Sequence, residues 1–156
     1  MQAPRDDAPH SGYFQRGSHR FAVRVYFEDT DLTGIVYHAN YLRYMERARS
    51  DMLRLAGIDQ RAAHEGGEGA YTVVAIAIRY RNPARLDEAL VVVSDIGEIR
   101  AASCVIQQRV MRANTILTEA EVTAALVSAK GRPLRQPRAW VDAFKRLQAG
   151  DFQTDE

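Results

Sequence analysis

Three carboxylates, a glycine and a histidine occur within a short stretch of the chain, in an order that suits hydrolytic chemistry. The stretch runs from Glu28 to Tyr41 and reads EDTDLTGIVYHANY. A helical pattern begins directly after it. The positive end of a helix can polarise a carbonyl group while a nearby carboxylate attacks that carbonyl or activates water. The stretch therefore predicts a hydrolytic site, without deciding which of the acids acts.

An amphipathic pattern predicts the helix that positions this site. Its apolar residues recur with a 3.6-residue period and form a single stripe of Tyr41, Tyr44, Met45, Ala48, Met52 and Leu55. We expect the helix to start between Tyr37 and Asn40 and to stop before Gly57. Its first N–H groups have no partner within the helix. They therefore point back at the acidic loop, where an anion or a polarised carbonyl can bind.

Strand patterns dominate the rest of the chain. We expect strands at residues 21–27, 71–81, 89–99, 103–111 and 115–127, and a short terminal helix at 140–147. The length of these strands and their short connections predict an antiparallel meander. No helical pattern separates the later strands, as a parallel sheet would require. The predicted fold class is α+β, with one long helix wrapped by a curved antiparallel sheet of about five strands.

Length and composition fit one globular domain of 156 residues, 46% of them apolar and 26% charged. We expect a flexible leader over residues 1–19, a domain over 20–148 and a flexible tail over 149–156. The net charge of +1 gives no reason to expect nucleic-acid binding. No segment approaches the roughly 20 apolar residues of a membrane span. The lone Cys104 fits a reducing compartment, and we predict a cytoplasmic protein.

Several motifs resemble those of a known family. They are RVYFEDTD at 24–31, GIVYHANY at 34–41, ERAR at 46–49, PARLDE at 83–88 and EAEV at 119–122. Through them the chain resembles the hotdog-fold acyl-CoA thioesterases of the 4-hydroxybenzoyl-CoA thioesterase type. It looks most like the Tol–Pal-associated acyl-CoA thioesterases of Gram-negative bacteria. Leu32 and Thr33 depart from the small Ala-Gly pair common in that family, which leaves the catalytic position intact and can change the pocket floor.

The resemblance implies a hotdog fold, dimers whose sheets join, often tetramers, and active sites between protomers. It implies hydrolysis of acyl-CoA to a free acid and coenzyme A, without a cofactor or metal, with acyl carrier protein as an alternative acyl donor. It also implies that Asp31 is catalytic, either as nucleophile or as general base for water. His38 would orient the thioester, protonate the leaving thiolate or hold the attacking water.

Other residues receive supporting roles. Gly34 and Tyr37 are expected to support the loop and the oxyanion site, since glycine permits a close backbone approach. The alternative for Gly34 is a simple turn. The candidate substrate-binding residues are Tyr41, Arg79, Arg81 and Arg85. The arginines would meet the phosphates of coenzyme A, and their alternative is a solvated strand face.

Other functions compete with this one. An aryl-CoA thioesterase, acting on hydroxybenzoyl or naphthoyl groups, would use the same acid with a different pocket. A non-catalytic acyl-binding or scaffold module that serves the cell envelope is another alternative, and it predicts acyl-CoA binding without turnover. A hotdog dehydratase needs a helix-borne acid or histidine arrangement that the sequence does not show. A divalent-metal site at the acidic stretch lacks the spacing of common zinc sites and is not expected.

Overall fold

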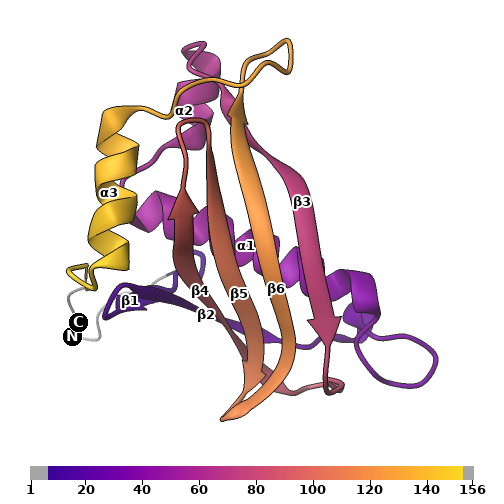
Figure 1. Cartoon of the computed structure of the whole chain (residues 1–156). Coiled ribbons are helices and arrows are strands. Elements are labelled where there is room, and N and C mark those ends of the chain that lie inside the picture. Colours follow the sequence, from indigo (N-terminus) through magenta and orange to yellow (C-terminus); the bar gives the residue numbers. More distant parts are fainter. Residues whose placement is uncertain (1–6, 153–156) are drawn as a thin grey trace.

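A six-stranded sheet wraps the long helix α1 in the computed structural model, which describes residues 7–152 (Figure 1). The elements in chain order are β1 (Tyr13–Gln15), β2 (Ser18–Arg24), a 3₁₀ helix (Phe27–Asp29), α1 (His38–Leu55), α2 (Gln60–Glu65), β3 (Ala70–Tyr80), β4 (Ala89–Ile99), β5 (Ser103–Arg112), β6 (Thr115–Val127) and α3 (Arg138–Gln148). Neighbouring strands are antiparallel, in the order β1-β2-β4-β5-β6-β3. The predicted fold is confirmed, with β1 as an additional strand.

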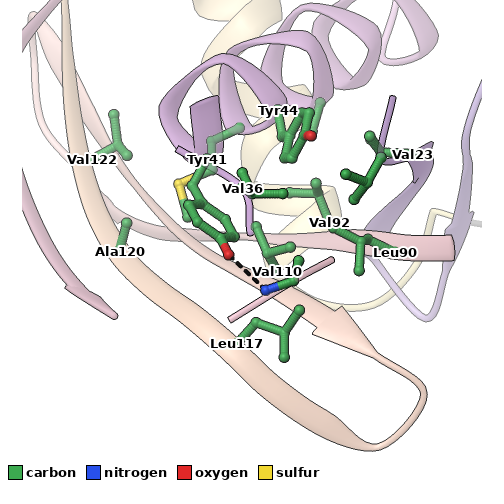
Figure 2. Close-up of a cluster of buried hydrophobic side chains, with 14 residues drawn as sticks. Val23, Val36, Tyr41, Tyr44, Leu90, Val92, Val110, Leu117, Ala120 and Val122 are labelled. Carbon is green, nitrogen blue, oxygen red and sulfur yellow. Dashed lines mark hydrogen bonds between the residues drawn. The ribbon is translucent and has the colours of Figure 1, made fainter. Parts of the chain in front are cut away.

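Helix α1 buries its predicted apolar stripe against the inner face of this sheet. Tyr44, Met45 and Ala48 are at most 1% exposed. They pack with inward-facing valines such as Val92 and Val110 (Figure 2). Helix α1 lies mainly over β2, β4 and β5. The inner face of β3 therefore receives little cover from the helix.

Strand β3 is an edge of the sheet and pairs only with β6. Ile76 lies opposite the buried Val122, so its side chain is on the same face as α1. It is nevertheless 39% exposed, and Val73 and Tyr80 on the same face are 42% and 46% exposed. A long apolar edge strand is normally covered, because its free backbone groups invite pairing with another strand.

The structure corrects the predicted leader and tail. Phe14 is 1% exposed in β1, so the chain is already ordered before residue 19. Its ring packs against Phe152 with centroids 4.7 Å apart, and Gly17 donates its N–H to the Phe152 carbonyl at 3.1 Å. The strand expected at 21–27 instead begins at Ser18 and ends at Arg24. The remainder of the predicted leader and tail, residues 1–6 and 153–156, lies outside the described residues.

A buried polar cluster fastens the N-terminal segment to α1. His19 is fully buried, and its Nε2 lies 2.7 Å from Oδ2 of Asp51, which is 3% exposed. Gly12 donates its N–H to the same oxygen at 2.9 Å. Burial lowers the pKa of His19, which favours the neutral ring. Nε2–H is then the donor to the carboxylate.

We expect Asp51→Ala to lower the free energy of unfolding by about 2–4 kcal/mol, because the buried His19 ring and the part-buried Gly12 N–H lose their acceptor. Asp51→Asn is the matched control. A single amide oxygen can still accept both bonds, so its loss should stay below about 1 kcal/mol. Urea denaturation at a fixed protein concentration measures both changes. Equal losses in the two variants would contradict the role given to Oδ2.

Candidate active site

The acidic stretch forms a turn that fixes Asp31 in front of α1. Gly34 donates its N–H to the Asp31 carbonyl at 3.0 Å, and Asp31 donates its own N–H to Ile35 at 2.8 Å. Thr33 donates twice to Oδ1 of Asp31, from its N–H at 2.8 Å and from its hydroxyl at 2.6 Å. Both Thr33 bonds hold Oδ1, so Oδ2 is the oxygen that they leave available for chemistry.

Hydrogen bonds keep this carboxylate ionised. They lower the pKa of Asp31, with the Thr33 hydroxyl as the largest cause and the Thr33 N–H as the second. The direction follows because both donors stabilise the anion. The predicted roles of nucleophile and general base both need the ionised form.

Helix α1 begins at His38, inside the predicted window. Its N-cap residue, Tyr37, offers no side-chain hydrogen bond and packs its ring on His38 with centroids 4.4 Å apart. Asn40 ties the first turn to the acidic loop, since its side-chain amide donates to the Asp29 carbonyl at 2.9 Å. The N–H groups of His38 and Ala39 bond to no acceptor among the described residues. They can therefore polarise a bound carbonyl.

A surface hollow of about 410 Å³ joins these groups. Asp31 and His38 line it together with Tyr80 and Arg81, which come from the end of β3 and just after it. The Tyr80 hydroxyl donates to the His38 carbonyl at 2.9 Å. Figure 1 shows the loop before α1 beside the arrowhead of β3. The turn, the helix start and the edge strand thus meet at one place.

Tyr41 is mainly a core residue. It is 3% exposed, and its hydroxyl accepts the Ala84 N–H at 3.0 Å, shown as the dashed line in Figure 2. Burial is the main cause that raises the pKa of Tyr41. Its ring also borders the hollow, so a part in substrate binding stays a prediction.

The other predicted residues lie at different distances from the hollow. Gly34 has φ +78°, a backbone conformation that favours glycine, so the turn needs this residue. A Cβ at this position would meet nothing within 4 Å, so the expected close backbone approach does not occur within this chain. Arg81 lines the hollow and donates from Nε to Glu119 at 2.6 Å. Arg79 borders a separate hollow of about 730 Å³ that Arg81 also lines. Arg85 is exposed in the loop after β3.

Sequence reasoning missed the role of Thr33. It noted this residue only as a departure from the family pattern, whereas the structure shows that it holds Asp31. The signal was present, because an aspartate two residues before a threonine often accepts that residue's N–H in a turn.

Metal and membrane features are absent from the part of the chain that the structure describes. No group of three or more histidine, cysteine, aspartate or glutamate side chains is placed to hold a metal ion there. Within the same residues, no helix combines the length and the apolar character needed to cross a membrane.

Fold and site together define the class. The model of the thioesterase-like superfamily matches residues 25–147. The chain belongs to this family of hotdog-fold thioester hydrolases, as its motifs predicted.

The names of individual relatives describe an activity more specifically than the family does. The acyl-CoA thioesterase YbgC of Haemophilus influenzae is 40% identical over 129 residues, which cover 82% of this chain and 95% of that protein. The acyl-CoA thioester hydrolase YbgC of Escherichia coli O6:H1 is 42% identical over 129 residues, covering 81% and 96%. A crystal structure of a probable thioesterase from Bartonella henselae superposes with a TM-score of 0.74 at 35% identity, covering 77% and 99%.

Proposed function

We propose that this protein hydrolyses acyl-CoA to a free carboxylic acid and coenzyme A. One observation carries the proposal: the ionised Asp31 and His38, the first residue of α1, line one hollow. A carboxylate facing a polarising helix end suits attack on a thioester carbonyl. The names of the two YbgC relatives support coenzyme A as the thiol carrier.

Two routes use the same geometry. As nucleophile, Oδ2 of Asp31 attacks the thioester carbon, the C–S bond breaks, and water then hydrolyses the resulting anhydride. As general base, Asp31 takes a proton from the water that attacks the thioester carbon. In both routes the oxyanion forms beside the N–H groups of His38 and Ala39. The departing thiolate takes a proton, and we assign its delivery to His38.

We expect His38→Ala to lower kcat about 10- to 100-fold with little change in KM. The imidazole is lost, but the backbone N–H of residue 38 remains to polarise the carbonyl. His64→Ala is the matched control, because His64 is exposed on α2 and lies outside the hollow. Thiol release from acyl-CoA measures both variants. A raised KM with unchanged kcat would assign His38 to binding instead.

We further propose that the protein dimerises through β3. The strand is an eleven-residue edge whose sequence, AYTVVAIAIRY, contains no acid, lysine or proline to discourage pairing. Two copies related by a two-fold axis can pair such a strand with itself in antiparallel fashion. The partner would then cover Val73 and Ile76, which α1 leaves exposed.

This dimer would complete the active site. Antiparallel pairing brings Tyr80, beside the hollow, close to the first residues of the partner's β3. A cavity of about 340 Å³ lies at that end of β3, with Met52, Tyr71 and Phe144 among its walls. We assign the acyl group to the partner's copy of this cavity. Its volume is near the lower end for ligand pockets, which favours short chains or one aromatic ring over long fatty chains.

Thiol release across short, long and aromatic acyl-CoA substrates tests the activity. The best substrate distinguishes the aliphatic thioesterase from the aryl-CoA alternative. Binding of acyl-CoA without turnover on any substrate would support the scaffold alternative instead. Turnover restricted to acyl carrier protein thioesters would replace coenzyme A as the carrier.

The resemblance also supports three proposals about location, assembly and physiological role. They are a cytoplasmic location, a homotetramer of two dimers, and a link to Tol–Pal envelope maintenance. Fractionation and light scattering test the first two. For the third, a deletion strain should show an envelope defect that the wild-type gene rescues. Rescue by the Asp31→Asn gene would separate the envelope role from hydrolysis.

A further inference from the structure

A single cation lines the cavity of about 340 Å³ to which we assign the acyl group. Arg49 of α1 is the only lysine or arginine among the described residues around this cavity. Most of the other lining residues are apolar, such as Met52, Ile106 and Phe144. Arg49 is half-buried and forms no ion pair within residues 7–152. A guanidinium group in such surroundings is costly unless an anion or hydrogen bonds compensate its lost hydration.

A buried amide holds this guanidinium group in place where α1 crosses β5 (Figure 1). Nη1 of Arg49 donates to Oε1 of Gln108 at 2.9 Å. Gln108 is 2% exposed, and its Nε2 donates to the Met45 carbonyl and to the Ser94 hydroxyl, both at 2.9 Å. Because a carbonyl can only accept, these bonds turn the amide oxygen toward Arg49. The guanidinium group is therefore positioned before a ligand binds, which lowers the entropic cost of binding.

The charge of Arg49 and most of its donors remain available to a ligand. A guanidinium group carries five N–H bonds in a planar fork, and within residues 7–152 the bond to Gln108 occupies one of them. Burial lowers the pKa of Arg49 and the charge of Glu46 raises it, but a guanidinium group stays protonated in proteins. Glu46 lines the same cavity but is exposed, so water and salt screen its charge. The planar fork suits a carboxylate, whose two oxygens accept paired N–H bonds.

We propose that the preferred acyl group carries a second carboxylate at the end remote from the thioester, and that Arg49 binds this carboxylate. The inference rests on the proposed thioesterase activity and on the assignment of the acyl group to this cavity. The apolar wall packs on the methylene groups, and the guanidinium group replaces the water that the carboxylate loses on entry. A neutral acyl chain of equal length would bring no acceptor to the remaining donors of Arg49. The substrate class is then a short dicarboxylic acyl-CoA.

The test compares glutaryl-CoA with pentanoyl-CoA, whose acyl chains have the same number of carbons and differ in the terminal carboxylate. After subtraction of spontaneous hydrolysis, kcat/KM of the wild type should be at least about tenfold higher for glutaryl-CoA. Arg49→Met removes the charge and keeps an unbranched side chain. Its kcat/KM for glutaryl-CoA should fall at least about 30-fold, and that for pentanoyl-CoA should stay within about threefold.

The matched control is Arg54→Met, which removes the same charge from an exposed position of α1 outside the cavity. It should leave both values of kcat/KM unchanged. Circular dichroism checks the fold, and Arg49→Gln, whose amide can still donate a hydrogen bond, replaces Arg49→Met if that variant does not fold. Equal values for the two substrates in the wild type, a preference for pentanoyl-CoA, or equal losses on both substrates in the Arg49 variant would overturn the proposal.

Direct binding separates this inference from the activity itself. Thioethers of coenzyme A cannot be hydrolysed, so S-(4-carboxybutyl)-CoA and S-pentyl-CoA compare the two chain ends without turnover. If the wild type hydrolyses no thioester, calorimetry should still show at least about fivefold tighter binding of the carboxylate thioether by the wild type and by Arg54→Met. The Arg49 variant should bind both thioethers equally. Equal binding of the two by the wild type, or a preference that the Arg49 variant keeps, overturns the carboxylate site.

Discussion

Asp31→Asn is expected to lower kcat for acyl-CoA hydrolysis by about 10²–10⁴-fold. The amide has the shape of the carboxylate but cannot attack the carbonyl or take a proton from water. Its oxygen can still accept the two Thr33 bonds that hold Oδ1, so the turn should keep its conformation. KM should change little, because the loss falls on the transition state. Release of free thiol, followed at saturating substrate, measures the effect.

Glu28→Gln is the matched control for charge in the acidic loop. Glu28 is an exposed neighbour that forms no ion pair in the described part of the chain, so its neutralisation should leave kcat within about twofold. Wild-type turnover by a folded Asp31→Asn would remove Asp31 from the chemistry. A comparable loss in both variants would point to the net charge of the loop.

The pH profile offers a second readout of the same carboxylate. Its pKa is lowered from the ordinary value of 3.8, and the ionised form is the active one. The hydrolysis rate should therefore not be limited by protonation of Asp31 at pH values well above 3.8. It should decline only as the pH falls through the lowered pKa. Thr33→Val removes the hydroxyl donor, which should move that acid limb upward.

The strongest sequence signals were long and periodic. The apolar stripe of α1 predicted the helix, because residues that recur with a 3.6-residue period fall on one face of a helix. The first residue of the stripe, Tyr41, also indicated where the helix starts. The four later strands were also placed within about a residue, because their apolar runs are long and end at turn residues. The hairpin around Phe14 was missed, since the three-residue strand is stabilised by contact with Phe152 far along the chain.

The site was partly visible for similar reasons. The acidic loop and the helix start are neighbours in sequence, so the spacing of Asp31 and His38 was enough to place them together. Tyr80 reaches them only because β3 ends beside the loop, which is a tertiary contact. Arg79 was chosen with Arg81 and Arg85 because coenzyme A carries phosphates, but it borders a separate hollow between β3 and its neighbours, a placement that the strand pairing decides.

Ile76→Lys is expected to convert the proposed dimer into monomers and to lower kcat/KM at least about 100-fold. Ile76 lies at the middle of β3 on the face that α1 leaves uncovered, and its 39% exposure becomes burial once a partner strand pairs there. A charge at that position would be removed from water without a partner, which strongly disfavours association. Because the hollow and the acyl cavity come from different protomers in this proposal, separation of the protomers also separates the two halves of the site.

Ala22→Lys is the matched control, since it adds the same charge to an exposed position of β2, a strand that does not pair with β3. Light scattering coupled to gel filtration gives the mass, circular dichroism shows that both variants fold, and thiol release gives the activity. A monomeric wild type, or an Ile76→Lys that remains dimeric, contradicts pairing through β3. A monomeric Ile76→Lys with wild-type kcat/KM would still support dimerisation of the wild type through β3. It would contradict the shared site, because one protomer would then supply every group that hydrolysis needs.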